Sequence, residues 1–350
     1  MVRILVGPMA ACYNGRAMKV GELGEFGLID RLAGMLGSTP QGSRPELILG
    51  IGDDAAAWQD GSAVQLASID SLVQGVHFNL EWTSWPDLGW KALAVGLSDI
   101  AAMGGEAAYV LVSLALPDDT DVADVTALYS GMIELAGQHD VAIAGGNISQ
   151  APLVVINVAA SGSAAAGDKL LRRDSAKPDD RIAVSGHPGT AAAGLEMLTT
   201  GTTFDAETQA VLSGSFLHPQ PRLALGQLLV KRGVAAAIDL SDGLLADLGH
   251  LCRASGTGAR LEKERLPVHP AVRAGFHNRA AELALSGGED YELLFTAGAE
   301  IIDRIAAEAG LPITVIGEIV AGPPGDITLV DRDGKHHKPR QAGWEHFAAR

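Results

Sequence analysis

Residues 47–55 read Leu-Ile-Leu-Gly-Ile-Gly-Asp-Asp-Ala, an apolar run that enters a glycine turn and meets two adjacent aspartates. The run matches the G-x-G-x-x-A fingerprint of dinucleotide-binding folds, and Asp70 follows Gly50 by twenty residues, as that fingerprint requires. In such a fold the turn opens a helix whose amino-terminal end faces the pyrophosphate. Here Ala55 leads through Trp58 and a polar turn into another strand-like run. The stretch therefore argues against NAD or FAD binding, and its two aspartates would repel a pyrophosphate unless metal ions lay between them.

The rest of the chain alternates strand-like and helix-like patterns, which predicts an α/β (α+β) fold. Predicted strands lie at 47–49, 64–69, 109–114, 141–146, 153–158, 181–185, 235–238 and 293–296, and predicted helices at 87–103, 122–137, 190–199 and 243–254. The region 141–167 carries no charged residue, but several polar residues interrupt it. We interpret it as two buried strands joined by a polar turn and not as a membrane span.

The composition excludes several classes of protein. Lys and Arg number 26 against 42 Asp and Glu, a formal net charge of −16 that disfavours a nucleic-acid clamp. The 350 residues are 47% hydrophobic, as in ordinary globular proteins. The two cysteines, Cys12 and Cys252, provide neither a disulfide framework nor a cysteine-rich metal site. We expect a cytoplasmic protein with no nucleic-acid partner and no membrane partner.

The length exceeds that of a typical single core, which predicts two domains. A polar stretch at 166–180 marks the boundary between them. We assign residues 1–20 to a loose leader, residues 21–167 to an amino-terminal domain and residues 168–350 to a carboxy-terminal domain. The apolar run of the leader is broken by Gly7 and Pro8 and is too short for a secretion signal.

Several aspartates stand where an apolar core is expected. In the predicted helix 87–103, Asp99 lies three and four residues from apolar positions, so its carboxylate points with the apolar face. A buried carboxylate needs a partner, and from position alone an arginine or lysine is as good a candidate as a metal ion. In the strand that ends at Asp70, Ser68 lies on the same face as that carboxylate.

The segment Asp239-Leu-Ser-Asp-Gly243 joins a predicted strand to a predicted helix. Either Ser241 or Asp242 is a good helix N-cap, so one of the two is explained without function, whereas Asp239 has no such explanation. Oxygen ligands thus gather at the ends of several strands, and such sets suit Mg²⁺ or Mn²⁺ bridging substrate phosphates. The set comprises Asp54, Asp70, Asp99, Asn147, Asp239 and Asp242.

Five motifs, in this order along the chain, carry a resemblance to a known family. They are Gly50-Ile-Gly-Asp-Asp-Ala, Ser68-Ile-Asp-Ser-Leu-Val-Gln-Gly-Val-His-Phe, Lys91-Ala-Leu-Ala-Val-Gly-Leu-Ser-Asp-Ile-Ala-Ala-Met-Gly, Ile238-Asp-Leu-Ser-Asp-Gly-Leu and Leu285-Ser-Gly-Gly-Glu-Asp-Tyr-Glu-Leu. With them the chain resembles, from Gly24 to Phe347, the thiamine-monophosphate kinases. Their superfamily also includes aminoimidazole ribonucleotide synthetase, selenophosphate synthetase and the hydrogenase maturation factor HypE.

The resemblance implies a homodimer formed by pairing of the amino-terminal sheets, and a carboxy-terminal domain folded over ATP. It implies phosphorylation of thiamine monophosphate to thiamine diphosphate with several Mg²⁺ ions, and it leaves a monovalent cation open. The implied metal ligands are Asp54, Ser68, Ile69, Asp70, Asp99, Asn147, Asp239 and Asp242. The implied ATP contacts are Gly146, Asn147, Arg173 and Ser241. The implied thiamine monophosphate contacts are His77, Glu289 and Trp344, with Glu289 near the cationic heterocycle.

Two positions depart from the commonest family pattern, since Asn147 stands where many members have Asp and Ile69 where many have Thr. An amide ligates a metal without contributing charge, and Ile69 can offer only its backbone.

We expect no general base, because a phosphate nucleophile is already ionised near neutral pH. Two alternatives stay open: an ATP-dependent ligase of the same superfamily, and a non-catalytic nucleotide or divalent-metal binding protein.

Overall fold

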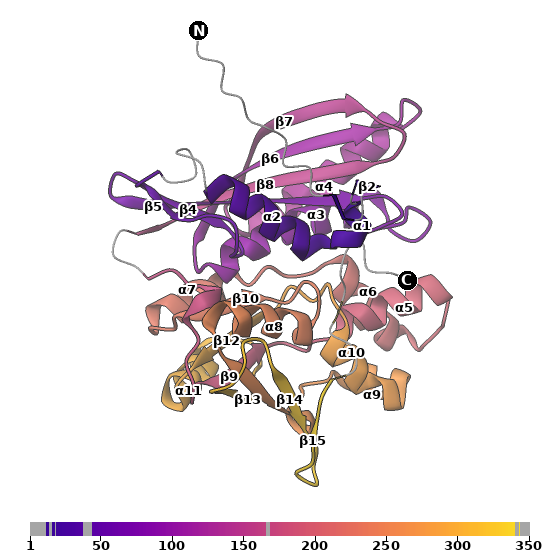
Figure 1. Cartoon of the computed structure of the whole chain (residues 1–350). Coiled ribbons are helices and arrows are strands. Elements are labelled where there is room, and N and C mark those ends of the chain that lie inside the picture. Colours follow the sequence, from indigo (N-terminus) through magenta and orange to yellow (C-terminus); the bar gives the residue numbers. More distant parts are fainter. Residues whose placement is uncertain are drawn as a thin grey trace. The chain divides into compact units, whose positions relative to one another are not determined.

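Figure 1 shows a computed structural model of the chain, which describes residues 12–13, 16–17, 19–37, 44–165, 169–339 and 343. The chain forms two compact units, residues 1–45 with 345–350 and residues 46–344. The smaller unit contains two short antiparallel strands and two helices: β1 (Cys12–Tyr13), β2 (Arg16–Ala17), α1 (Val20–Leu23) and α2 (Glu25–Gly37). The other residues of the predicted leader, and the predicted domain boundary between residues 167 and 168, lie outside the described ranges, so both stay predictions.

The larger unit contains a six-stranded sheet in the order β3-β4-β5-β8-β6-β7. Its strands are β3 (Leu47–Leu49), β4 (Ala56–Asp60), β5 (Ala63–Val73), β6 (Glu106–Leu116), β7 (Ala142–Gln150) and β8 (Val155–Ala165). All neighbouring pairs are antiparallel except β6 and β7. Helices α3 (Trp85–Ala102) and α4 (Val122–Gln138) pack against each other beside this sheet. The apolar patterns predict every one of these strands except β4, and both helices.

Strand β7 corrects one expectation. The prediction of two strands and a turn within 141–167 is confirmed by β7 and β8, but the prediction that both are buried is wrong for β7, which is exposed along nearly its whole length. The cause is its position, because β7 is the last strand of the sheet and hydrogen-bonds only to β6 among the described strands. A run of small uncharged residues therefore marks an edge strand here and not a core strand.

A second sheet of seven strands has the order β10-β12-β9-β13-β11-β14-β15. Its strands are β9 (Arg181–Ser185), β10 (Ala236–Asp239), β11 (Gly258–Glu262), β12 (Leu293–Ala297), β13 (Ile313–Val320), β14 (Ile327–Val330) and β15 (His336–His337). The surrounding helices are α5 (Thr190–Thr200), α6 (Ala206–Leu217), α7 (Leu223–Lys231), α8 (Leu244–Ser255), α9 (Pro270–Phe276), α10 (Ala280–Ser286) and α11 (Ala299–Glu308). Strands β9, β10 and β12 are almost fully buried, as expected for a sheet covered on both faces.

The alternation of side chains along β9 shows these two faces. Ile182 and Val184 enter a core that includes the apolar stripe of α8, whereas Ala183 enters a separate core with residues of α7 and α11. Within the described ranges, no helix is both long enough and apolar enough to cross a membrane.

Helix α3 contacts both sheets of the larger unit, which makes it the element that positions the site. It lies against β5 and β8 of the first sheet and against β10 of the second. It begins after Ser84, whose side chain accepts from the amide of Asp87, and it is buried on nearly all sides. Small residues allow this close packing: a Cβ on Gly96 would lie 3.2 Å from a methyl carbon of Val158 on β8. Side chains of α3 can therefore reach residues from both sheets.

Candidate functional site

Three aspartates form an acidic triad: Asp54 from the turn before β4, Asp99 from α3 and Asp239 from the end of β10. One carboxylate oxygen of each lies within 4.8 Å of the others. Asp239 is only 3% exposed, and Asp54 is buried as well. The prediction that carboxylates from distant parts of the sequence converge is therefore confirmed for these three residues.

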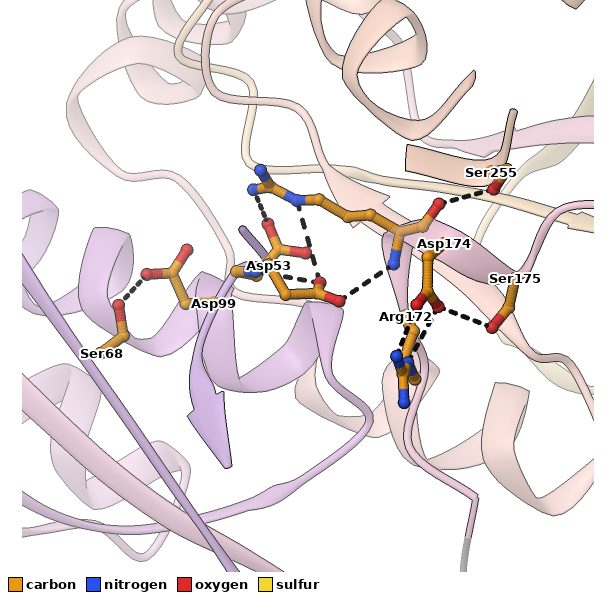
Figure 2. A network of polar contacts seen from close by, with 9 residues as sticks. Asp53, Ser68, Asp99, Arg172, Asp174, Ser175 and Ser255 are labelled. Atoms are coloured by element: carbon orange, nitrogen blue, oxygen red, sulfur yellow. Dashed lines mark hydrogen bonds and ion pairs between the residues drawn. The ribbon is translucent and has the colours of Figure 1, made fainter. Parts of the chain in front are cut away.

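Neighbouring serines orient two members of the acidic triad. The Ser68 hydroxyl on β5 donates to Asp99, as Figure 2 shows. The Ser98 hydroxyl donates to Asp239 at 2.6 Å. Consecutive residues of α3 thus reach different sheets, since Ser98 meets β10 while Asp99 meets β5. Among the described residues, Asp99 meets the Ser68 hydroxyl and Asp70 and forms no ion pair, so the alternative that it pairs with an arginine or lysine is wrong.

Arg173 supplies the positive charge of the site. Its guanidinium pairs with Asp54, and its Nε lies 3.9 Å from a carboxylate oxygen of Asp53. Its backbone amide donates to Asp53 at 3.2 Å, and its carbonyl oxygen accepts from the Ser255 hydroxyl at 2.7 Å, at the other end of the network in Figure 2. The resemblance implied Arg173, whereas no signal pointed to Asp53, whose carboxylate accepts from the Arg173 backbone amide.

The crowding of acids raises their pKa values. Burial, and then the neighbouring Asp54, raises the pKa of Asp53 to about 6 and that of Asp239 to about 8. Burial raises the pKa of Asp70 to about 6, although a hydrogen bond with Asp99 opposes the shift. Burial together with Asp70 and Asp239 raises the pKa of Asp99 well above its usual range. A cation among these groups would remove the mutual repulsion that opposes their ionisation.

The donor set fits a hard divalent cation. Two buried carboxylate oxygens, one on Asp54 and one on Asp70, have no hydrogen-bond partner among the described residues. Buried polar atoms are normally paired, so orphaned carboxylate oxygens beside the triad are suited to a ligand. All-oxygen sets of this kind are typical of Mg²⁺ and Mn²⁺. Asp54, Asp70, Asp99 and Asp239 could therefore hold such an ion.

The turn after β10 corrects the helix-cap expectation. The N-cap of α8 is Gly243, with φ of 115°, and it makes no side-chain cap hydrogen bond. The acid that satisfies this helix end is Asp247, which accepts from the amides of Asp242 and Gly243 at 3.2 and 3.0 Å. The prediction that Ser241 or Asp242 caps the helix is wrong, because a Cβ at position 243 would lie 2.9 Å from the Ser286 backbone and only glycine suits the turn.

Asn147 is not a member of the acidic triad. It lies on the exposed strand β7 opposite Ser113, and no contact with the three aspartates is seen within the described ranges. Its neighbour Gly146 has a structural role, since a Cβ there would be 1.7 Å from the carbonyl oxygen of Val112 on β6. The roles of Asn147 in metal binding and of both residues in ATP binding stay predictions.

The residues implied for thiamine monophosphate have structural contacts of their own. His77 accepts through Nδ1 from the Val73 amide at 3.0 Å in the turn after β5. Glu289, in the loop before β12, pairs with Lys91 of α3, a lysine that is only 1% exposed. Trp344 lies outside the described residues. Their substrate contacts stay predictions, as does the metal contact of Ile69, whose side chain is 69% exposed.

Lys91 and Ser98 are two further site residues, and the sequence carries a signal for both. Together with Leu88, Val95 and Ala102 they form one helical stripe at spacings of three and four. Polar side chains on an apolar stripe need partners, and the structure supplies Glu289 for the lysine and Asp239 for the serine. Asp99 was identified as a polar side chain on an apolar helix face, and the same criterion applies to Lys91 and Ser98.

Comparison with known proteins agrees with this architecture. Residues 52–164 match the family model "AIR synthase related protein, N-terminal domain", and residues 177–330 match its C-terminal counterpart. The hydrogenase maturation protein HypE, solved in complex with ATP, has the same fold, with a TM-score of 0.69 at 19% identity over 91% of this chain and 95% of that one. The expected two-domain α/β fold of this superfamily is confirmed.

Relatives with higher identity narrow the family. The thiamine-monophosphate kinase of Salmonella typhimurium strain LT2 is 41% identical over 332 residues, which span 93% of this chain and 98% of that protein. A solved structure described as "AaThiL complexed with AMPPCP and TMP" is 33% identical, with a TM-score of 0.82 over 94% of this chain and 99% of that one. The chain therefore belongs to the thiamine-monophosphate kinase family of AIR synthase related proteins.

Proposed function

We propose that this protein transfers the γ-phosphoryl group of ATP to thiamine monophosphate and releases thiamine diphosphate and ADP. The observation that carries the proposal is the acidic triad with its orphaned oxygens, since phosphoryl transfer between two anions needs concentrated positive charge. Family membership supports the substrate, because a relative of similar fold and length binds an ATP analogue together with TMP.

The acidic triad would hold Mg²⁺ with Asp70 and Ser68 beside it, and Asp242, Asn147 and the Ile69 backbone are further expected ligands. Ions held there would neutralise charge on the phosphates. A buried site suits this task, because electrostatic interactions are stronger where water is excluded. Ser68 and Ser98 keep two of the carboxylates oriented through their hydroxyl hydrogen bonds.

A phosphate oxygen of thiamine monophosphate attacks the γ-phosphorus in line, and the bond from that phosphorus to the bridging oxygen of ADP breaks. The nucleophile is ionised before it attacks, so no side chain needs to remove a proton. Arg173 would contact the triphosphate, with Gly146, Asn147 and Ser241 near the nucleotide. The protein contributes mainly by holding the two anions in reacting position.

Glu289 is the acid proposed to face the cationic heterocycle of thiamine monophosphate, with His77 and Trp344 as further contacts. The pairing of Glu289 with Lys91 leaves its side chain 24% exposed, so it can meet a ligand from the open side. A carboxylate partner suits a permanently cationic ring because it pairs opposite charges in a partly desolvated place.

A homodimer formed through the six-stranded sheet is part of the proposal. Ile69 of β5 and Leu111 of β6 both lie opposite Ala159 of β8, so the three form one row across the sheet. Ile69 and Leu111 are 69% and 52% exposed, and Tyr109 and Ile148 are also exposed. Large exposed apolar side chains on one sheet support an interface with a second copy. The cytoplasm is the compartment we expect.

The proposed activity is tested by incubating the purified protein with ATP, Mg²⁺ and thiamine monophosphate and separating the products by chromatography. Equal amounts of thiamine diphosphate and ADP, both abolished by EDTA, are the expected result. ADP and inorganic phosphate without thiamine diphosphate would favour the ligase alternative. No ADP would favour the binding-protein alternative, and retained activity in EDTA would contradict the metal requirement.

A further inference from the structure

Helix α3 carries a second buried charge outside the acidic triad. Lys91 pairs through Nζ with Glu289, and the same Nζ lies 3.3 Å from the ring centroid of Phe216 on α6. The Phe216 ring in turn packs against Trp82, with centroids 5.8 Å apart. An ammonium group over an aromatic face is stabilised by the negative charge of that face. Lys91 is thus held from two sides, and it presents its charge to one carboxylate.

The spacing along α3 connects this ion pair to the acidic triad. Lys91 precedes Ser98 by seven residues and Asp99 by eight, which is about two helical turns, so all three lie on one side of the helix. The rise of an α-helix separates them by roughly 10–12 Å along its axis. Ser98 orients Asp239, and Asp99 is itself a member of the triad, so the helix that carries Lys91 also sets how far Glu289 lies from the triad.

The backbone of Glu289 is held independently of Lys91. Its φ is 71°, a left-handed conformation that is uncommon outside glycine, and Tyr291 has φ of 50°. The Glu289 amide donates to the Ser241 carbonyl at 2.7 Å, and the Tyr291 amide donates to the Leu240 carbonyl at 2.8 Å. Loss of Lys91 would therefore leave the loop attached to the segment after Asp239. Without Lys91, the Glu289 carboxylate would lose the ion pair that fixes its direction.

We propose that Lys91 is a positioning residue for thiamine monophosphate, which holds the Glu289 carboxylate toward the substrate at a fixed distance from the acidic triad. The inference rests on the proposed function. A buried ion pair is weak evidence for stability, because desolvation offsets its attraction. The role of this pair in the proposal is to fix the direction of the Glu289 carboxylate. Lys91 acts through Glu289 and does not itself contact the substrate.

The test uses the full-length protein and measures KM for each substrate and kcat by formation of thiamine diphosphate. Lys91→Met is expected to raise KM for thiamine monophosphate about tenfold or more, the range typical of lost supporting partners. Its KM for ATP and its kcat should stay within about threefold of wild type, because the triad keeps its serines. Lys91→Arg should recover most of the loss. Glu289→Gln should match Lys91→Met, and the double variant should be no worse than either.

Arg222→Met is the matched control. Arg222 pairs with the buried Glu292, three residues after Glu289, so this variant also removes a cation from a buried carboxylate of the same motif. We expect it to lower the melting temperature and to leave KM for thiamine monophosphate within about threefold of wild type. An Arg222→Met variant that raises this KM as much as Lys91→Met does would mean that any damage to the motif has the same effect, and it would overturn the proposal.

Other outcomes also decide against Lys91 as a positioning residue. An unchanged KM for thiamine monophosphate in Lys91→Met, an equal rise in both KM values, or additive losses in the double variant would each overturn it. If Lys91→Met does not fold, Glu289→Gln decides, because a wild-type KM there removes the basis of the proposal. A wild-type protein that forms no thiamine diphosphate would overturn the proposed function itself, an outcome distinct from any result with the variants.

Discussion

Replacing Asp239 with Asn should stabilise the metal-free protein while it abolishes most of the activity. The variant keeps an oxygen that can accept the Ser98 hydroxyl, whose present distance is 2.6 Å, and it removes one charge from the acidic triad. Burial raises the pKa of Asp239 from 3.8 to about 8. The folded state therefore binds this proton more tightly than the unfolded state does.

The sign of the pH dependence follows from that difference. The free-energy cost of ionising Asp239 in the folded state is absent below pH 3.8, increases as pH rises, and reaches its full value above pH 8. The free energy of unfolding of the metal-free protein therefore decreases across this range. One pKa unit corresponds to about 1.4 kcal/mol, which gives a penalty of at most about 4 kcal/mol at pH 7. We expect Asp239→Asn to gain about 2–4 kcal/mol in free energy of unfolding at pH 7 and to show a shallower slope with pH.

The assay is urea unfolding between pH 5 and pH 9 in EDTA, repeated with Mg²⁺, alongside formation of thiamine diphosphate. Mg²⁺ should stabilise the wild type more than the variant, and turnover of the variant should fall by about a hundredfold or more. Asp303→Asn is the matched control, because it removes one negative charge from an exposed position on α11. An Asp239→Asn variant that is less stable than wild type in EDTA would contradict the raised pKa of Asp239. A variant that retains turnover at saturating Mg²⁺ would contradict its role in metal binding.

Three further substitutions test separate parts of the molecule. Arg173→Met removes the partner of Asp54 and should weaken binding of a non-hydrolysable ATP analogue about tenfold or more in calorimetry. Unchanged affinity would contradict the proposed contact between Arg173 and the triphosphate. Gly146→Ala should destabilise the protein by about 1–3 kcal/mol or more in urea even without nucleotide, because its Cβ would meet the Val112 carbonyl oxygen at 1.7 Å. Normal stability would disprove this packing. Burial, and then Arg253, lowers the pKa of His250 from 6.5 to about 4. The unfolded state therefore binds this proton more readily, and the free energy of unfolding decreases by up to about 3 kcal/mol as pH falls from 6.5 to about 4. His250→Gln should flatten that part of the urea unfolding profile, and an unchanged profile would show that His250 does not cause the loss.

Local patterns were sufficient for most elements near the site. The predicted helix 87–103 corresponds to α3 at Trp85–Ala102, and the predicted strand 235–238 corresponds to β10 at Ala236–Asp239. Periodicity succeeds here because each element buries one face or is buried throughout, so its spacing is visible within a short window. The patterns did not predict α6 and α7, which connect the second sheet to α3.

Errors arose where a local signal had two physical explanations. An uncharged run suits a core strand and an edge strand equally, and only the strand order showed that β7 is an edge strand. Ser241 and Asp242 have good N-cap chemistry, but the path of the chain required the left-handed Gly243 at that position, and Asp247 took over the exposed amides. In both cases contacts distant in sequence decided between the explanations.

The amino-acid pattern alone placed Asp99 on an apolar helix face and Asp239 at the end of an apolar strand, because side-chain direction follows from the local periods of helices and strands. It also determined the family, through motifs that need no structure. Only the tertiary structure decided the partners: Asp99 and Asp239 meet each other and Asp54, Arg173 lies against Asp54, and Lys91 lies against Glu289. The physical reason is that a buried charge requires a partner but does not specify which one, and the choice depends on how α3 packs between two sheets.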